Sequence, residues 1–492
     1  MSRSGHISRL HVLCAHEPDA DPRIGWTSDA ARQHGYDTQT IGWIAGRDEN
    51  DVLDNASHSI RLNHASPAHS STWLLGKFTG VAGVSTLWAL SLLASPIALI
   101  WLVGTLFLMP WRIFDYLLER LRWHEQTTRR VERLVLRIRA WVFWRVDGLF
   151  KGGIVRLING LNAYSWYFFT HAGAFARRYA RWLESHPDSI PDVIHANDPD
   201  ALMAAALVKR IHGCRIIYDA HEYGPDAYIL HTTPRPAFFI YERLLMRHVD
   251  GAVTVSPPIA DKFNSEYDGR PEFHTVPNAP PLDAKLAADP QFSLDAMARG
   301  RVRILYQGGF AANRGLEQII ESWAAIDDQQ AVLFFRGPNN DYREQLIALA
   351  RETGKLDTSI FFLPSVSENK LTAAACHADI GIIPYLSHIE NHEGACPNKL
   401  GQYMQAGLAI AAANLPFVKS ILDAGECGVI YDDQASSAMS DALSDLVSNP
   451  EKVQKMGQSG RKHALKVYNF EAYFPVLDRL YRNEQTVTPA PH

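Results

Sequence analysis

The sequence predicts an α/β protein with two doubly wound domains, and three observations support that prediction. Short apolar strands alternate with helical stretches in two consecutive series. A proline-rich stretch at residues 277–290 separates the two series, as an interdomain linker does. At 492 residues the chain is also too long for one hydrophobic core. Because ligands of such folds bind beyond the carboxyl ends of the parallel strands, we expect the functional residues just after those strands.

The first series begins near the N-terminus and resumes close to residue 190. RLHVLCA at residues 9–15 reads as a strand. The stretch TSDAARQHGYD at residues 27–37 reads as a helix that ends at Gly35, and TQTIGWI is the next strand. PDVIHA, CRIIYDA and GAVTVS are further strands, each followed by a helical stretch. These elements predict an N-terminal Rossmann-like domain over residues 1–280, interrupted by an insertion at about 70–160.

The second series starts at RVRILYQ and continues with the strands AVLFFRG, SIFFLP, DIGIIP and LAIAAA. It predicts a second Rossmann-like domain over residues 281–470. We expect residues 471–492 to form a helix that packs back toward the first domain, followed by a frayed tail.

Composition excludes several functional classes. A formal net charge of -5 argues against a nucleic-acid binder that relies on overall positive charge. Five scattered cysteines without a C-x-x-C pair argue against a disulfide framework or a structural zinc site, and they fit a reducing cytosol.

The insertion contains the strongest local anomaly of the sequence. Residues 78–111 carry no charged side chain over 34 positions, and nine of the twelve tryptophans lie in or near this region. Ser95-Pro96 divides the run into two halves, each short for a full bilayer crossing. We therefore expect a hydrophobic helical hairpin that enters the membrane from one side. Two full crossings, or a helical pair buried in a soluble core, are the alternatives.

Residues 112–156 follow the uncharged run with eleven Lys or Arg against five acids. Apolar residues recur there at helical spacing, which predicts basic amphipathic helices lying on anionic membrane lipids; a solvated helix packed on the protein is the alternative. Strands on both sides of the insertion share one sheet, so both lie on the same side of the membrane. The arginines place that side at the cytoplasmic face of the inner membrane.

Two segments of the second domain carry residues suited to an anionic ligand. In YQGGFAANRGLEQIIESW a glycine turn leads from a strand to a helix, and Arg314 precedes that helix. Backbone N–H groups and a guanidinium can together clamp a diphosphate, although glycine turns also join strands to helices with no ligand. In HIENHEGACPNKLGQYMQAGLAIAAAN a polar loop leads into a helix that begins at Pro397 and ends at Gly407, which again forms an anion site.

These motifs resemble the retaining glycosyltransferases of family 4, also called glycosyl transferases group 1. The resemblance rests on P-N-K-L-x-x-Y-M-x-A-G and Y-Q-G-x(5)-R-G-L-E, together with D-V-I-H-A-N-D-P-D-A-L, I-Y-D-A-H-E and V-T-V-S-P-P-I-A. It covers residues 8–45 and about 190–484. It implies the GT-B fold of two facing Rossmann-like domains, and transfer of a sugar from a nucleotide diphosphate with the anomeric configuration retained.

The resemblance also implies roles for residues of the second domain. Arg314 would grip the diphosphate, and Glu393 would touch the donor sugar. The residues expected to bind the donor are Gly308, Gly309, Arg314, Cys396, Pro397, Asn398, Lys399 and Gln402. The sequence departs from the family pattern at three of its positions. Gly394 and Gln402 stand where the E-x7-E motif has its two glutamates, the second of which holds the ribose, and Gly309 stands where many members carry an arginine.

In the first domain, His221 follows the strand CRIIYDA, and the resemblance places it beside the donor sugar and the acceptor. Such a histidine can donate to a sugar hydroxyl or exchange a proton; a loop histidine capping the next segment is equally compatible. The residues expected on the acceptor side are His16, Asp21, Arg23, Asn197, Asp198 and Glu222. Helix-cap and turn roles are the alternatives for Asn197, Asp198 and the loop from His16 to Arg23.

No metal or other cofactor is expected. Asp19-Ala20-Asp21 and Asp198-Pro199-Asp200 match a D-x-D sugar-metal pattern on paper, but both lie in proline turns of the first domain. In retaining enzymes of this fold the leaving phosphate itself can take the acceptor proton, so stabilising that phosphate is the main catalytic task.

We therefore expect a membrane-attached glycosyltransferase with a nucleotide-sugar donor and a lipid-linked or membrane-proximal saccharide acceptor. Two alternatives stay open: a catalytically silent homologue acting as a partner subunit, and a GT-B epimerase acting on the nucleotide sugar itself.

Overall fold

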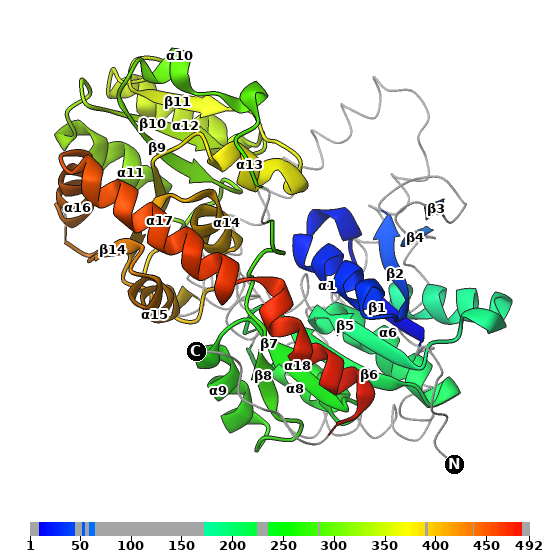
Figure 1. The fold of residues 1–492 in the computed structure, drawn as a ribbon. Helices are drawn as coiled ribbons and strands as arrows, with labels where there is room; N and C mark the ends of the chain where they lie inside the picture. The colour runs from blue at the N-terminus through cyan, green and yellow to red at the C-terminus, as the bar shows by residue number, and fades with distance from the viewer. Residues whose placement is uncertain are drawn as a thin grey trace, which may run out of the picture.

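The computed structural model describes residues 9–44, 52–54, 59–63, 172–223, 235–283, 286–388, 392–435 and 437–484. It contains two α/β domains, each built on a mainly parallel sheet, which lie side by side (Figure 1). The predicted fold class is confirmed to this extent. The predicted hydrophobic hairpin and basic amphipathic helices fall outside the described residues.

The first domain has an eight-stranded sheet in the order β3-β4-β2-β1-β5-β6-β7-β8, parallel except for the β3–β4 pair. Its strands are β1 (Arg9–Leu13), β2 (Asp37–Ile44), β3 (Val52–Asp54), β4 (Ser59–Asn63), β5 (Val193–Asn197), β6 (Arg215–Ala220), β7 (Gly251–Thr254) and β8 (Phe273–Thr275). The chain runs outward from β1 in one direction and from β5 in the other. The sheet therefore has its topological switch point between β1 and β5, where ligands of such folds bind.

The helices of this domain are η1 (Pro18–Ala20), α1 (Pro22–Gln33), a helix at residues 172–185, η3 (Pro187–Ser189), α6 (Asp198–His212), α8 (Arg235–Met246) and α9 (Pro257–Glu266). α1 starts five residues before the predicted helix. Asp21 caps it by accepting a hydrogen bond from the Arg23 backbone N–H at 2.9 Å, and Pro22 occupies its first turn. Residues that the sequence indicated as a loop are therefore fixed at the start of a helix.

The second domain has a fully parallel sheet in the order β11-β10-β9-β12-β13-β14, with its switch point between β9 and β12. Its strands are β9 (Val302–Gln307), β10 (Ala331–Arg336), β11 (Ile360–Leu363), β12 (Ile380–Ile383), β13 (Ala409–Ala413) and β14 (Gly428–Tyr431). The predicted strands of this domain all form, because each is a short apolar run buried between helices. β14 and, in the first domain, β3, β4 and β8 were not predicted from the sequence.

The helices of the second domain are η4 (Pro290–Phe292), α10 (Asp295–Ala298), α11 (Leu316–Ser322), η5 (Trp323–Ala325), α12 (Asp341–Glu352), η6 (Glu368–Lys370), α13 (Leu371–Ala375), α14 (Asn398–Ala406), α15 (Pro416–Gly425), α16 (Ala438–Val447) and α17 (Pro450–Lys466). α14 ends at Gly407, whose φ of 79° is the left-handed conformation expected of a glycine helix cap.

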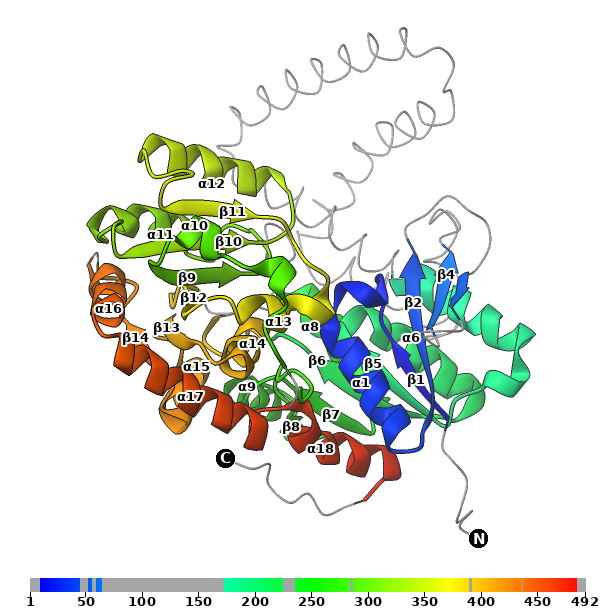
Figure 2. The ribbon, with the colours of Figure 1, turned by 45° about the horizontal axis from the view of Figure 1, so that its top comes forward.

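The last helix, α18 (Phe470–Arg482), leaves the second domain and packs on the first beside α1 (Figure 2). Tyr36 donates a hydrogen bond to Asp478 at 2.6 Å, and Arg215 donates to the Leu480 carbonyl at 2.9 Å. Phe474 and Leu477 are buried in the core of the first domain. This crossing ties the two domains together at the end of the chain. Within the described part of the chain, no helix is both long enough and apolar enough to cross a membrane.

Candidate active site

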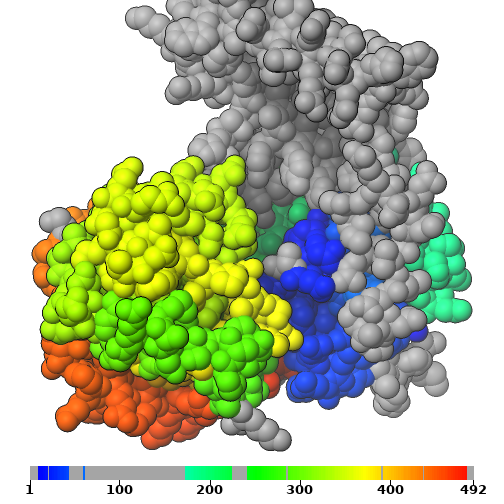
Figure 3. Space-filling view, turned by 90° about the horizontal axis from the view of Figure 1, so that it is seen from above, coloured from blue at the N-terminus to red at the C-terminus, as the bar shows by residue number. Residues whose placement is uncertain are grey.

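The candidate site lies between the two domains, where the switch points of both sheets face each other. The strands β1, β5 and β6 end at its first-domain side, and β9 and β12 end at its second-domain side. Seen from above, the yellow surface of the second domain adjoins the blue surface of α1 (Figure 3). Residues from segments far apart in the sequence therefore meet here.

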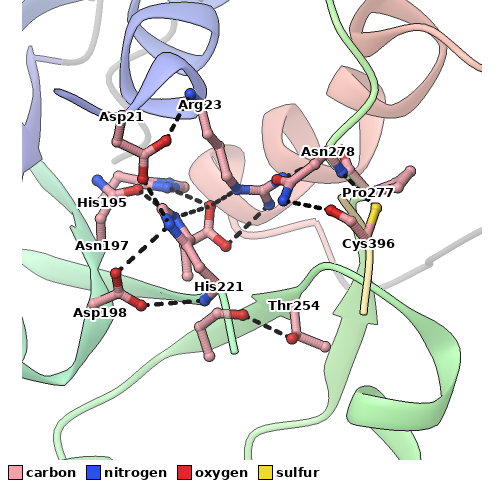
Figure 4. A network of polar contacts seen from close by, with 12 residues as sticks. Asp21, Arg23, His195, Asn197, Asp198, His221, Thr254, Pro277, Asn278 and Cys396 are labelled. Carbon is pink, nitrogen blue, oxygen red and sulfur yellow. Dashed lines mark hydrogen bonds and ion pairs between the residues drawn. The ribbon is translucent and has the colours of Figure 1, made fainter. Parts of the chain in front are cut away.

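His221 is the centre of a polar network on the first-domain side (Figure 4). Its Nδ1 lies 2.9 Å from Asp21 Oδ2 and 3.6 Å from Asp198 Oδ2, and its Nε2 lies 3.1 Å from Asn197 Oδ1. The Asn197 side chain donates its own Nδ2–H to the Leu13 carbonyl at 2.9 Å, so Oδ1 is the atom that faces the histidine. Both ring nitrogens thus face acceptors, and both must donate.

The charges around this histidine favour the imidazolium form. Burial alone lowers the pKa of His221, but the carboxylates of Asp198, Asp21 and Asp219 outweigh it and raise that pKa well above its usual value. A histidine that keeps its proton at neutral pH does not fit the expected role of proton exchange. Both N–H groups already bind protein acceptors, so the imidazolium acts mainly as a buried positive charge that fixes Asp21 and Asn197.

Among the carboxylates of this network, Asp198 is the one whose burial is least offset by neighbouring positive charge. Burial raises its pKa to about 6, while His221 opposes that shift. Its Oδ1 accepts a hydrogen bond from the His221 backbone N–H at 3.3 Å, and its φ of 62° is left-handed. The side chain of Asn197, at the cap position of α6, makes no cap hydrogen bond, so the cap alternative fails for Asn197. The strained backbone at residue 198 is consistent with a functional position.

Arg23 lies beneath the site and does not line it. It is 1% exposed, and its Nε and Nη2 donate to the two oxygens of Asp219 at 2.8 and 3.0 Å. Burial raises the pKa of Asp219, but Arg23 and His221 outweigh it and hold that pKa well below its usual value. The geometry therefore supports a structural role for Arg23 where the sequence suggested acceptor contact.

Two residues of the network were not singled out from the sequence. Asp219 joins Arg23 to His195, whose Nε2 lies 3.1 Å from Asp219 Oδ2 and whose Nδ1 accepts from Tyr481 of α18 at 2.8 Å. Burial lowers the pKa of His195, so this ring is neutral. Asp219 is a charged residue at the carboxyl end of the apolar strand β6, two residues before His221, and that position is the signal that could have found it.

The two remaining acceptor-side candidates lie at the edges of this network. His16 is half-buried, and its Nδ1 lies 3.0 Å from the Glu17 carbonyl. The Glu222 carboxylate raises the pKa of Arg314 after larger contributions from Tyr385 and Tyr306, which places its charge toward the second domain. Glu222 itself is exposed, directly after His221 in the chain.

Two cations of the second domain meet around one aromatic side chain. Lys399, 4% exposed, donates to the Tyr385 hydroxyl at 3.1 Å and lies 4.6 Å from the centre of its ring. Arg314 lies 5.5 Å from the same ring centre and donates to the Gly309 carbonyl at 3.3 Å. Among the described residues, neither cation forms an ion pair with a carboxylate. Two adjacent, partly desolvated cations without an anionic partner form a site for an anion such as a diphosphate.

The positions of Lys399 and Gly309 account for one departure from the family pattern. A Cβ added at Gly308, whose φ is 143°, would lie 3.4 Å from the Lys399 Nζ. The ammonium of α14 therefore lies against the glycine turn after β9. It supplies positive charge beside Gly309, where many family members carry an arginine.

Gln402 is held in a chain of hydrogen bonds. Its Oε1 accepts from Gln307 at 3.2 Å, and its Nε2 donates to Glu368 Oε1 at 3.1 Å. Burial, followed by the Asp21 carboxylate, raises the pKa of Glu368 to about 7. Glu368 had no place in the sequence-based site, because it lies in a short helix after β11 and 34 positions from Gln402.

Gly394 is in close contact with the first domain. Its carbonyl accepts a hydrogen bond from Ser256 Oγ at 2.7 Å, and a Cβ there would lie 2.5 Å from Ile259 Cγ1. Its neighbour Glu393 is exposed and lies 3.2 Å from Lys262 of α9. The structure thus places Glu393 in an ion pair at the rim between the domains, and no described contact connects it to Arg314 or Lys399.

The start of α14 holds the other expected donor residues. Cys396 is buried, and its sulfur accepts from the Asn278 backbone N–H at 3.1 Å. Pro397 is the N-cap residue of α14, and Asn398 is its first helical residue. Asn278 also accepts from Arg23 at 3.2 Å, so the linker connects α14 to the buried arginine of the first domain. Among the described residues, no group of three or more His, Cys, Asp or Glu side chains could hold a metal ion.

Comparisons with known proteins agree with this geometry. Residues 296–463 match the family model "Glycosyl transferases group 1", and residues 128–279 match "Glycosyl transferase 4-like domain". The chain is 24% identical over 317 residues to phosphatidyl-myo-inositol mannosyltransferase of Mycobacterium leprae (strain TN), which covers 63% of this chain and 77% of that protein.

Solved structures share the fold along nearly the whole chain. Sucrose-phosphate synthase from Thermosynechococcus elongatus superposes with a TM-score of 0.64 at 14% identity, covering 97% of this chain and 98% of that one. Anabaena HepE in complex with UDP and glucose gives a TM-score of 0.61 at 10% identity, covering 97% of this chain and 100% of that one. These structures show the fold, and the two family matches with the mannosyltransferase relative show the activity. Together they identify the protein as a nucleotide-sugar-dependent glycosyltransferase of the family 4 type with the GT-B fold.

Proposed function

We propose that this enzyme transfers a sugar, with retention of configuration, from a nucleotide diphosphate to a lipid-linked or membrane-proximal saccharide at the cytoplasmic face of the inner membrane. The donor half of this proposal is supported mainly by the pair of cations Arg314 and Lys399, which meet at the switch point of the second sheet. Neither has a carboxylate partner in the part of the chain that the structure describes. The complex of Anabaena HepE with UDP supports a nucleotide donor.

The arrangement of charge supports the chemistry of retention. Arg314 and Lys399 would stabilise the negative charge that develops on the leaving diphosphate, and the leaving phosphate oxygen would accept the proton of the attacking hydroxyl. Glu222 and Asp198, on the opposite side of the site, are acceptors that can orient sugar hydroxyls. Neither step requires a metal ion, so we expect activity to survive chelation of divalent cations.

The acceptor half of the proposal rests on the insertion and on one relative. Residues 78–111 and the basic stretch after them would hold the first domain at anionic lipids, close to a lipid-linked acceptor. The mannosyltransferase of Mycobacterium leprae acts on phosphatidyl-myo-inositol by its name, which supports a lipid acceptor. GDP-mannose is therefore a suitable first donor to test, with UDP-glucose as the second.

The test is transfer of labelled sugar to extracted lipids, together with binding of GDP and UDP by titration calorimetry. Arg314→Ala and Lys399→Ala should each weaken diphosphate binding by about 2–4 kcal/mol, because each removes a charged contact in a sheltered site. Lys419→Ala is the matched control, since this exposed lysine lies on α15. A parent protein that binds no nucleotide would support the silent-homologue alternative instead. A changed nucleotide sugar without acceptor would indicate an epimerase.

A further inference from the structure

The chain of hydrogen bonds that ends at Glu368 has a fixed direction. Arg336 carries only donors, and its Nη1 donates to Gln307 Oε1 at 3.2 Å. The other end of the Gln307 amide donates to the Leu371 carbonyl, which can only accept, at 3.2 Å. Two independent partners thus fix the orientation of Gln307, which is buried.

The orientation of Gln307 determines that of Gln402. Because Gln307 Nε2 also donates to Gln402 Oε1, the amide oxygen of Gln402 already accepts one hydrogen bond from the protein. Its Nε2 therefore faces Glu368, which accepts through Oε1. The Gln402 oxygen thus keeps one lone pair at most for a ligand. The stronger acceptor next to it is Oε2 of Glu368, which takes no hydrogen bond within the part of the chain that the structure describes.

The position of this pair relative to the cations indicates what it faces. Gln402 and Lys399 are three residues apart on α14, so their side chains share one face of the helix, about 5–6 Å apart. A carboxylate repels phosphate, and the Asp21 carboxylate across the site adds to that repulsion by acting on Glu368. The ligand group beside Glu368 is therefore an uncharged part of the donor that is attached directly to its diphosphate.

We infer that Glu368, with the amide of Gln402, binds the vicinal hydroxyls of the donor nucleoside, and that Glu368 has taken over the carboxylate role that position 402 lacks. Oε2 accepts from one hydroxyl, and the remaining N–H of Gln402 donates to its neighbour. The ribose is the diol in question because both residues belong to the second domain, with the two cations. The transferred sugar must instead reach the first-domain network around His221. This inference rests on the proposed nucleotide donor.

The experiment measures binding of GDP, UDP, their 2′-deoxy and 3′-deoxy analogues and inorganic pyrophosphate to the full chain. At pH 8, above the raised pKa of Glu368, E368Q should weaken GDP or UDP binding about ten- to a hundredfold, because it replaces a charged acceptor. It should leave pyrophosphate binding unchanged and remove the preference for ribose over the deoxy analogues. E352Q is the matched control, since Glu352 is exposed on α12 of the same domain.

Exchanging the carboxylate and the amide between residues 368 and 402 tests their pairing directly. Q402E alone places two carboxylates side by side and should also weaken nucleotide binding, whereas Q402E/E368Q restores one carboxylate and should recover most of the affinity. Parent-like ribose preference in E368Q, or an equal loss of pyrophosphate binding, would overturn the inference. If Arg314→Ala still weakens nucleotide binding as proposed in that case, the proposed function stands without this inference. If the parent binds none of the nucleotides, the proposed function fails first.

Discussion

Closure of the two domains over the site should depend on the absence of a side chain at residue 394. Gly394→Ala would place a methyl carbon 2.5 Å from Ile259 Cγ1 and 3.1 Å from Ser256 Oγ, both in the first domain. Ile259 is buried at the start of α9, so it cannot move aside freely. The least costly response is a separation of the domains at this contact.

The size of the effect follows from two contributions. Overpacking a tight contact costs about 1–3 kcal/mol, and loss of the Ser256–Gly394 hydrogen bond adds about 1 kcal/mol. The sum shifts the balance between closed and open arrangements by roughly 30- to 1000-fold toward the open one. Nucleotide binding should change little, because Arg314 and Lys399 belong to the second domain alone.

The assay measures nucleoside diphosphate binding and the rate of sugar transfer separately. We expect Gly394→Ala to bind the nucleoside diphosphate within about twofold of the parent while the transfer rate falls at least about tenfold. Small-angle scattering should detect a larger radius of gyration. Gly25→Ala is the matched control, because a Cβ at that helical position of α1 meets nothing within 4 Å. Parent-like transfer by Gly394→Ala would refute the idea that this contact is needed for catalysis. Gly394→Glu, which restores the family residue, should be at least as impaired.

Three further predictions concern the histidine, a buried carboxyl and the insertion. His221→Ala should lower the transfer rate at least tenfold while nucleoside diphosphate binding stays near the parent value; undiminished transfer would contradict the site. Burial raises the pKa of Glu242 to about 7 from an ordinary 4.5, so its contribution to stability is complete below pH 4.5 and is lost as the pH rises to 7. Glu242→Gln should therefore gain about 3 kcal/mol relative to the parent between pH 5 and 8 in denaturant unfolding, and a pH-independent difference would show that this carboxyl does not titrate there. A single cysteine replacing Ser95 should resist an impermeant thiol reagent from the periplasmic side, whereas efficient labelling would mean two full crossings.

The parallel strands could be predicted because each is a continuous apolar run bounded by turn residues. The missed strands β3, β8 and β14 are three or four residues long, so no apolar run marks them. β4 has five residues, but only Ile60 and Leu62 of them are apolar. The switch-point positions of His221 and Arg314 followed from the rule that ligands bind at strand ends. That rule identifies the loop in which a functional residue lies. It does not show which atoms of the side chain are free to bind a ligand.

Whether a side-chain atom is free to bind a ligand depends on hydrogen-bond and ion-pair partners that lie far away in the sequence. Arg23 is a plausible sugar ligand by its position after β1, and only the Asp219 carboxylate, 196 residues later, shows that its guanidinium is occupied. Glu393 is likewise next to the motif position, and its contact with Lys262 comes from a helix of the other domain. Pairings of this kind arise in the folded chain and leave no local pattern.

The two departures from the E-x7-E pattern look alike in sequence, but they have different physical causes. At residue 394 the first domain is so close that no side chain fits, so the change removes a group and permits contact between domains. At residue 402 an amide of nearly the same shape is retained, because Gln307 donates to its oxygen and Glu368 accepts from its nitrogen. A glutamate at 402 would accept from Gln307 equally well, but it would face the Glu368 carboxylate without a proton to share above pH 7. Glutamine at 402 is thus the residue that a carboxylate at 368 requires, and we expect the two positions to tolerate substitution together far better than singly.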